Sequence, residues 1–241
     1  MHCNLLFDLD QTLLDFHASE HIALKLVMEM NGLEFAEKNY DYFRQINKDL
    51  WLEFEKGIIS KTGLFENRFR LLFEKCGCDP DRFDLLKTNN DFIDIMSHNG
   101  VPMEGVTGFL EKIRNDIPEA RMYVITNGVT RNAMGRISST GLDKYITEVF
   151  VSEKIGFSKP APEYFDIVTK TIGDPLGSYI VIGDSLTSDM LGARNSDLTS
   201  CWFMPAGDIE QMMKEYNIDY SASSFDELFE VLIRWSSVPV I

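Results

Sequence analysis

Two aspartates stand two residues apart at the end of an apolar segment near the N-terminus, within the run from Leu5 to Thr12. In extended backbone, residues i and i+2 share a face, so Asp8 and Asp10 can converge on one site, with the Thr12 hydroxyl near enough to orient a partner. Burying carboxylates there is costly unless a metal ion or hydrogen-bond donors face them. The pair therefore indicates a site for such partners, although a strand that simply ends in acidic turn residues has the same pattern.

Polar side chains follow three more apolar runs. Thr126 offers a hydroxyl group ahead of backbone amides that can point at an anion, and Lys159 precedes prolines that begin a helix. Asp184 ends a third run, and Asp189 follows five residues later. Separately, a turn, a solvated lysine and helix N-caps would explain these segments. Together they predict one site, because open α/β sheets bind ligands at the carboxyl ends of their strands.

The elements that position these residues alternate along the chain. Short apolar runs bounded by turn residues predict buried strands at residues 5–9, 122–126, 149–152, 179–183 and 201–204. Helical patterns supply the crossovers that parallel strands require, at residues 106–115, 130–140, 162–172 and 187–195. A capping box at residues 224–227 begins a last helix. The alternation predicts an α/β fold with a doubly wound parallel sheet.

Residues 15–99 break this alternation. They contain no convincing strand and several helical stretches, separated by turn signals such as Asn31-Gly32. We therefore predict a core of residues 1–14 and 100–241, with a helical domain of residues 15–99 inserted after the first strand. The two junctions, near residues 15 and 100–102, are the expected hinges.

The composition excludes several classes of function. The 241 residues carry 38 Asp and Glu against 23 Lys and Arg, a formal charge of −15 that repels nucleic-acid polymers and anionic membrane surfaces. A small anionic substrate stays compatible, because a few local cations and a metal ion can override that field at one cleft. The four cysteines lack metal-ligand spacing and are expected to be reduced thiols. The N-terminus has the features of neither a signal peptide nor a membrane span, so we expect a cytoplasmic location.

Taken together, these segments resemble the haloacid-dehalogenase-like (HAD) hydrolase superfamily. The resemblance rests on the Asp-x-Asp-x-Thr run from Asp8 to Thr12, the Thr126 turn, Lys159 and the Gly-Asp-(x4)-Asp segment that ends at Asp189. It covers essentially the whole chain. It implies a Rossmann-like core with a helical cap of the subfamily I type after the first strand.

The resemblance also implies a reaction and a cofactor. Asp8 would be the nucleophile that forms an aspartyl-phosphate, and Asp10 would protonate the leaving oxygen and then activate water, with Thr12 helping to orient it. The acid at Asp10 favours phosphoryl transfer, because the dehalogenase branch lacks an acid there. Mg²⁺ would have three protein ligands, namely the Asp8 and Asp184 carboxylates and the Asp10 backbone carbonyl.

The remaining residues of the set would hold the phosphoryl group or support the metal. Thr126, the Asn127 amide and Lys159 would bind phosphoryl oxygens, since this transition state needs positioning and charge stabilisation. Asp189 would support the metal-bound waters or Lys159.

A closer resemblance is to the YjjG-type nucleoside 5′-monophosphatases. The matching segments are residues 45–51, 55–61, 67–69, 126–128 and 192–195. An aromatic side chain such as Trp51 could stack on a nucleobase, and Lys48, Lys61 or Arg68 could attract an anion near the cleft. Aromatic residues at helical spacing are also typical of a packed interior, which is the alternative for these positions.

We therefore expect a Mg²⁺-dependent phosphomonoester hydrolase whose substrate is a small phosphorylated metabolite, preferably a nucleoside 5′-monophosphate. The alternative is a sugar-phosphate phosphatase or phosphomutase of the same superfamily, because lid geometry decides whether water or a second hydroxyl group receives the phosphoryl group. A non-catalytic ligand-binding relative is least compatible with the complete set of acids, Thr and Lys. We expect a monomer or a weak homodimer without nucleic-acid or membrane partners.

Overall fold

The computed structural model describes residues 3–237 and contains two compact units. One unit consists of residues 17–99, and the other joins the chain up to residue 16 to the chain from residue 100 onward. The sheet lies in the second, discontinuous unit. All four cysteines are free thiols, as expected. No helix among residues 3–237 is long and apolar enough to cross a membrane.

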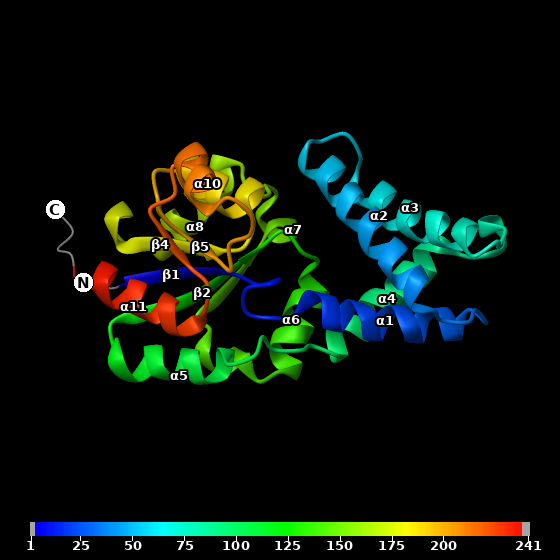
Figure 1. Cartoon of the computed structure of the whole chain (residues 1–241), viewed down its shortest axis with the longest axis horizontal. Helices are drawn as coiled ribbons and strands as arrows, with labels where there is room; N and C mark the ends of the chain where they lie inside the picture. Colours follow the sequence, from blue (N-terminus) through cyan, green and yellow to red (C-terminus); the bar gives the residue numbers. More distant parts are fainter. Residues whose placement is uncertain (1–2, 238–241) are drawn as a thin grey trace. The chain divides into compact units, whose positions relative to one another are not determined.

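Six parallel strands form one sheet in the order β3-β2-β1-β4-β5-β6. The strands are β1 (Cys3–Asp8), β2 (Ala120–Thr126), β3 (Glu148–Val151), β4 (Tyr179–Gly183), β5 (Thr199–Phe203) and β6 (Tyr220–Ala222). The chain enters the sheet at the interior strand β1, proceeds to one edge, and then returns to β4 and proceeds to the other edge. Figure 1 labels four of these strands, β1, β2, β4 and β5. The predicted doubly wound α/β fold is confirmed. The direction in which successive strands are added reverses between β1 and β4. The carboxyl ends of β1, β2 and β4 therefore lie next to one another.

Alternate residues of β1 face opposite sides of the sheet. Leu5 and Phe7 pack into an apolar cluster on one face, whereas Leu6 packs into a cluster on the other face. The first cluster includes residues of α5 (Val106–Asp116), α6 (Thr130–Ser139) and α11 (Phe225–Ser236), and the second includes residues of α8 (Pro162–Ile172) and α9 (Leu191–Asn195). Because helices cover both faces, the segment Leu5–Phe7 of this strand is continuously apolar rather than alternating.

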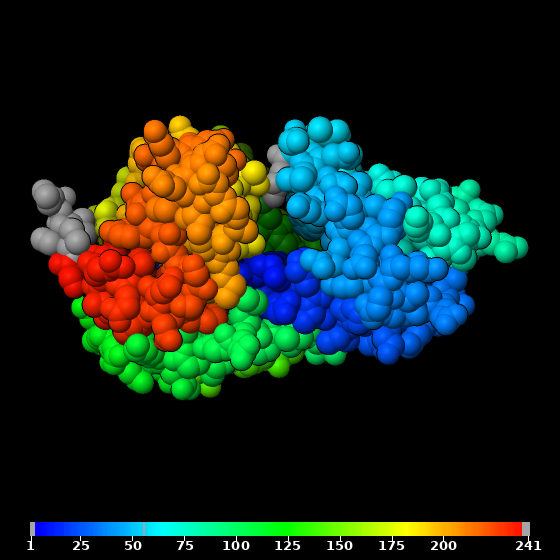
Figure 2. All heavy atoms as spheres, in the orientation of Figure 1, coloured from blue at the N-terminus to red at the C-terminus, as the bar shows by residue number. Residues whose placement is uncertain are grey.

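The last helix, α11, begins at the predicted capping box. Ser224 Oγ accepts a hydrogen bond from the Glu227 N–H at 3.2 Å, and Glu227 Oε2 accepts one from the Ser223 N–H at 2.8 Å. Figure 2 shows the surface of α11 beside that of α5. Lys112 Nζ of α5 lies 3.9 Å from the Phe229 ring centroid of α11, a cation–π contact that joins the two helices.

Some elements of this unit differ from the sequence-based expectation. The helix predicted at residues 187–195 is divided into η4 (Leu186–Met190), which has π-helical spacing, and α9. The sequence pattern predicts no strand at β6, because three residues are too few to establish a period. Two further helices and two 3₁₀ turns of this unit were not predicted from the sequence. They are α7 (Ser152–Ile155), α10 (Ile209–Tyr216), η2 (Leu142–Tyr145) and η3 (Leu176–Ser178).

The other unit is helical. Its elements are α1 (Phe16–Met30), α2 (Glu37–Glu55), α3 (Lys61–Lys75), η1 (Pro80–Arg82) and α4 (Leu85–His98). Phe43, Phe69 and Phe92 come from three of these helices and pack with ring centroids 5.5 to 5.7 Å apart. Ser60 and Asp84 cap α3 and α4 by accepting hydrogen bonds from backbone N–H groups of the first turn. An aromatic interior therefore holds this unit together.

Gly192 in α9 has no room for a side chain. A Cβ atom there would lie 2.3 Å from Phe165 Cε2 and 3.3 Å from Pro160 Cα. We expect Gly192→Ala to lower the free energy of unfolding by about 1–3 kcal/mol and the Tm by several degrees, because a close-packed interior must shift to admit a methyl group. Gly108→Ala in α5 is the control, since no atom lies within 4 Å of its Cβ, and it should retain or raise the Tm. Equal Tm values for the two variants in thermal scans would contradict this account of the packing.

Candidate active site

Predicted site residues meet at the carboxyl ends of β1, β2 and β4. Asp8 is the last residue of β1 and pairs in register with Ile125 of β2. Asp184 directly follows β4, which lies on the other side of β1. Lys159 reaches the same edge from the loop before α8, and its side chain contacts Asp8. The order of the strands is thus what brings residues from distant parts of the sequence together.

The ammonium group of Lys159 is buried in this edge. Nζ donates hydrogen bonds to Asp8 Oδ1 at 2.6 Å, to Asp189 Oδ1 at 2.6 Å and to the Ile125 carbonyl oxygen at 3.0 Å. Only 2% of the side chain is exposed. An ammonium group has three N–H donors, so all three are used within the protein. The alternative of a solvated surface lysine is excluded.

The charges of this cluster shift the pKa of both partners. Burial alone would lower the pKa of Lys159, but the carboxylates of Asp189 and Asp8 outweigh that effect and raise it. Burial raises the pKa of Asp8; Lys159 opposes this increase, while Asp189 and Asp184 add to it. One lysine therefore leaves the buried carboxyl groups short of positive charge, and the cluster favours a further cation.

Three carboxylates of the cluster could hold a metal ion. One oxygen each of Asp8, Asp184 and Asp189 lies within 4.8 Å of the others. Asp189 is fully buried, and its two oxygens already accept hydrogen bonds from Lys159 and from the Ser185 N–H, the latter at 3.2 Å. Asp8 and Asp184 are therefore better suited as metal ligands, whereas Asp189 fixes Lys159.

The residue before Asp184 must be a glycine. A Cβ atom at Gly183 would lie 2.3 Å from Asp189 Oδ2, which is closer than atoms can approach. The carboxylate of Asp189 thus packs directly against the end of β4. This close approach explains why a buried strand ends in Gly-Asp at the site.

The loop after β2 is fastened to the backbone of Lys159. The Asn127 side chain donates from Nδ2 to the Lys159 carbonyl oxygen at 2.9 Å and accepts at Oδ1 from the Lys159 N–H at 2.8 Å. Thr126 is buried; its Oγ1 accepts from the Gly128 N–H at 3.0 Å, and its N–H donates to the Tyr164 hydroxyl oxygen at 3.1 Å. The sequence indicates a role for the Asn127 amide, and the structure adds this side-chain link and Tyr164.

Asp10 lies beside a buried arginine that the sequence pattern does not single out. Arg136 Nη1, from α6, lies 2.6 Å from Asp10 Oδ1, and the Arg136 side chain is 1% exposed. Thr12 is fully buried, and its Oγ1 has no hydrogen-bond partner among residues 3–237. Thr12 therefore makes no hydrogen bond to Asp10 among these residues, and the arginine is the close partner of Asp10.

One candidate of the helical insertion belongs to the interior. Arg68 is buried, its Nε donates to Asn89 Oδ1 at 3.0 Å, and its Cζ lies 4.7 Å from the Phe92 ring centroid. Burial lowers the pKa of Arg68 to about 10. The expectation that Arg68 attracts an anion from solvent is therefore wrong, because its guanidinium group is satisfied within the helical unit.

The other candidates of the insertion are more accessible. Lys48 is exposed, and Trp51 is half-buried. The Trp51 and Phe54 rings meet edge to face at a centroid distance of 5.6 Å, and Lys61 Nζ lies 6.0 Å from the Trp51 centroid and 5.9 Å from that of Phe54. Trp51, Phe54 and Lys61 thus form an aromatic corner with an adjacent cation.

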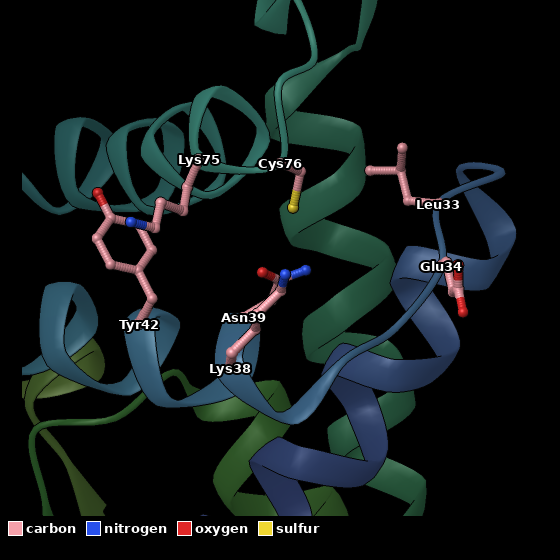
Figure 3. Close-up of a pocket in the computed structure, with 7 residues that line it drawn as sticks. All are labelled: Leu33, Glu34, Lys38, Asn39, Tyr42, Lys75 and Cys76. Carbon is pink, nitrogen blue, oxygen red and sulfur yellow. The ribbon is translucent and has the colours of Figure 1, made fainter.

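A cavity of about 610 Å³ lies within the helical unit (Figure 3). It is lined by Leu33, Glu34, Lys38, Asn39, Tyr42, Lys75 and Cys76. Lys75 extends over the ring of Tyr42, with Nζ 5.1 Å from its centroid. No predicted catalytic residue lines this cavity, and both of its lysines are exposed, so we assign it no catalytic role.

Comparison with known proteins agrees with this geometry. A family model described as haloacid dehalogenase-like hydrolase matches residues 4–197. The HAD-hydrolase YfnB of Bacillus subtilis is 32% identical over 95% of this chain and 94% of its own length. A crystal structure of YfnB bound to magnesium superimposes with a TM-score of 0.86 at 28% identity, covering 96% of this chain and 98% of that one.

Two similar proteins are named for a substrate class. The pyrimidine 5′-nucleotidase PynA of Streptococcus pneumoniae is 34% identical over 83% of this chain and 83% of its own length. The pyrimidine 5′-nucleotidase YjjG of Escherichia coli is 30% identical over 82% of this chain and 84% of its own length.

The affinity of the site for Mg²⁺ should depend on pH. Burial, with a further contribution from Asp189, raises the pKa of Asp184 to about 7. Below that pH a proton competes for the carboxylate, so we expect the apparent Mg²⁺ affinity to rise about tenfold from pH 6 to pH 8 in calorimetric titrations. Asp184→Asn, which removes both charge and proton, should bind Mg²⁺ weakly at each pH. Equal Mg²⁺ affinity of the parent protein at both pH values would contradict the prediction.

In the ion-free protein, the stability contributed by Asp184 should change with pH in the opposite sense to the Mg²⁺ affinity. Because the pKa of Asp184 in the folded state lies above its ordinary value of 3.8, the unfolded chain loses this proton first. The contribution of Asp184 to stability is therefore lost as the pH rises from about 4 to about 7. In thermal scans in EDTA, the Tm of Asp184→Asn should therefore rise relative to that of the parent as the pH increases across this window. Parallel curves for the two proteins would refute the raised pKa.

Proposed function

Since this chain belongs to the haloacid dehalogenase-like hydrolases, we propose that it is a Mg²⁺-dependent phosphomonoester hydrolase that works through an aspartyl-phosphate intermediate. The observation that carries this proposal is the buried ammonium group of Lys159, whose Nζ lies 2.6 Å from both Asp8 and Asp189 at the carboxyl edge of the sheet. This contact fixes the orientation of the Asp8 carboxylate. A fixed carboxylate at a ligand-binding edge is suited to be a nucleophile.

The first step transfers the phosphoryl group to Asp8. One carboxylate oxygen forms a bond to phosphorus while the bond from phosphorus to the ester oxygen breaks, and Asp10 donates a proton to the departing oxygen. Thr126 and the Asn127 amide bind phosphoryl oxygens. As Asp8 becomes a neutral acyl group, its hydrogen bond with Lys159 weakens, which frees one N–H of Lys159 for a phosphoryl oxygen.

The second step regenerates the enzyme. Asp10, now a carboxylate, accepts a proton from a water molecule as that water attacks phosphorus. The bond from phosphorus to the Asp8 oxygen breaks, inorganic phosphate leaves, and Asp8 returns to its ion pair with Lys159. Asp189 keeps Lys159 charged and in place throughout, because its carboxylate is fully buried against the ammonium group.

The donor set of this site fits Mg²⁺. Hard carboxylate oxygens are close enough to share one ion, and burial, followed by the charge of Asp189, raises the pKa of Asp184 in a way that a bound cation would oppose. We propose the Asp8 and Asp184 carboxylates and the Asp10 backbone carbonyl as the protein ligands. When bound, Mg²⁺ would supply positive charge against the phosphoryl oxygens and help to orient them.

We further propose that nucleoside 5′-monophosphates, pyrimidine nucleotides foremost, are the substrates. Support comes from the similarity to PynA and YjjG, which extends over about four-fifths of the chain. We propose the aromatic corner of Trp51, Phe54 and Lys61 as the contact for the base, since a flat base can stack on an aromatic ring beside a cation. We therefore propose residues 15–99 as a cap domain that selects the substrate.

Phosphate release from a panel of esters tests the proposed reaction. With Mg²⁺ we expect hydrolysis of p-nitrophenyl phosphate and pyrimidine 5′-nucleotides, loss of activity in EDTA, and recovery on adding Mg²⁺. Asp8→Asn should lower kcat about a thousandfold or more, because the nucleophile is removed. Undiminished turnover by metal-free protein, or by Asp8→Asn, would refute the proposal. A clear preference for hexose phosphates would agree with the proposed reaction but contradict the proposed substrate, which would then be a sugar phosphate.

Substitution of Trp51 tests recognition of the base. If the base stacks there, Trp51→Ala should lower kcat/KM for a pyrimidine nucleotide by about ten- to a hundredfold, while hydrolysis of p-nitrophenyl phosphate changes little. Tyr42→Ala is a matched control, because Tyr42 also lies on α2, is half-buried and has a lysine over its ring. It should not change the ratio of the two activities. An equal loss on both substrates in Trp51→Ala would mean that Trp51 serves the packing of the helical unit.

A further inference from the structure

Arg136 is a charged side chain in an unusual environment. It lies on α6, its side chain is 1% exposed, and two neighbours on the same helix, Ala133 and Ile137, belong to the apolar cluster under the sheet. Two of its nitrogens, Nε and Nη1, have no hydrogen-bond partner of good geometry among residues 3–237. Burying a guanidinium group is costly unless another charge compensates it. The compensating charge is Asp10, whose Oδ1 lies 2.6 Å from Nη1.

Asp10 is held at one edge of its carboxyl group. Oδ1 is buried against Arg136, yet the Asp10 side chain as a whole is 30% exposed. The exposed surface therefore lies on the rest of the side chain. A carboxyl group held in this way keeps one oxygen in the ion pair and leaves the other oxygen outside it, able to carry a proton.

The same arginine contacts the far end of the loop that contains Asp10. Its Cζ lies 5.5 Å from the Phe16 ring centroid. Phe16 donates its N–H to Gln11 Oε1 at 2.8 Å, and Gln11 donates its N–H to the Leu14 carbonyl oxygen at 2.8 Å. The loop is thus closed on itself by these hydrogen bonds, with Arg136 against both its first and its last residue. These contacts fix the position of the Asp10 side chain.

We propose that Arg136 is a positioning residue for the proton transfers of Asp10. It orients the Asp10 carboxyl group toward the departing oxygen in the first step and toward water in the second, without itself touching the substrate. The proposal rests on the proposed function, because it assigns a support to the proton carrier of that reaction. The proposal has a specific consequence. Loss of Arg136 should lower kcat/KM more for a substrate whose leaving group is more basic, because that leaving group depends more on protonation.

A pair of similar esters measures how strongly the reaction depends on protonation of the leaving group. Phenyl phosphate and p-nitrophenyl phosphate have nearly the same shape, but p-nitrophenolate departs readily without protonation, whereas phenolate is more basic and depends more on an acid. The parameter kcat/KM covers the steps up to departure of the phenol, so slow hydrolysis of the phosphoenzyme does not affect it. In Arg136→Met we expect kcat/KM to fall about ten- to a hundredfold for phenyl phosphate and less than about threefold for p-nitrophenyl phosphate.

A double-mutant cycle tests whether Arg136 acts through Asp10. In an Asp10→Asn background, Arg136→Met should lower kcat/KM for phenyl phosphate by less than about twofold, because the group that it positions is already gone. Arg136→Lys, which retains the positive charge, should recover part of the loss. Arg114→Met is the control, since Arg114 is an exposed arginine of the same unit whose Cζ lies 5.0 Å from the Tyr145 ring centroid. It should leave both esters unaffected.

Folding and function can be separated in these measurements. Thermal scans establish that each variant is folded, and if Arg136→Met is not, Arg136→Gln and Arg136→Lys are compared on the same two esters. An equal loss on both esters, or a full further loss in the Asp10→Asn background, would mean that Arg136 only stabilises the fold and would overturn the inference. If the parent protein hydrolyses neither ester with Mg²⁺, the proposed function itself fails, and the inference falls with it.

Discussion

The buried ammonium group of Lys159 is the interaction on which the site depends. Its three hydrogen bonds join the end of β1, the end of β2 and the turn η4 after β4, through Asp8, the Ile125 carbonyl and Asp189. Taking a lysine out of water costs several kcal/mol, and removing one partner of a buried ion pair costs about 3–5 kcal/mol, so these partners are tightly coupled. The Asn127 side chain adds two hydrogen bonds to the Lys159 backbone. The strand order, the lysine loop and the position of the nucleophile therefore form one system.

The same cluster carries more negative charge than Lys159 neutralises. Burial and neighbouring carboxylates raise the pKa of Asp8 and Asp184 together, although Asp8 is directly paired with the lysine. In a chain with a formal charge of −15, the local field would repel an anionic substrate. A divalent cation at these oxygens would relieve the repulsion and reverse the local field. The excess of negative charge destabilises the ion-free site. The same excess favours a divalent cation, which in turn allows a phosphate group to bind beside it.

The sequence was sufficient for the fold class and for the residues that gather at the strand ends, because both follow from local patterns. An apolar run that ends in a polar residue is visible in the sequence, and the parallel topology brings such ends to one edge. Contacts that depend on tertiary burial left no such signal. Arg136 and Arg68 are polar residues on amphipathic helices, a position typical of solvent exposure, yet both are buried beside partners far away in the sequence. The Asn127 side chain and the Tyr164 hydroxyl escaped prediction for the same reason, whereas the strand β6, with three residues, is too short to establish a period.

The central claim is that Asp8 is the residue that receives the phosphoryl group, and chemical trapping tests it most directly. The protein would be mixed with Mg²⁺ and p-nitrophenyl phosphate, quenched during turnover and treated with borohydride, which reduces an aspartyl-phosphate to homoserine. Mass spectrometry of the peptides would then locate the modified residue. The account predicts homoserine in place of Asp8 and unmodified Asp10, Asp184 and Asp189. Homoserine in place of one of those three, or release of phosphate with all four aspartates unmodified, would contradict it.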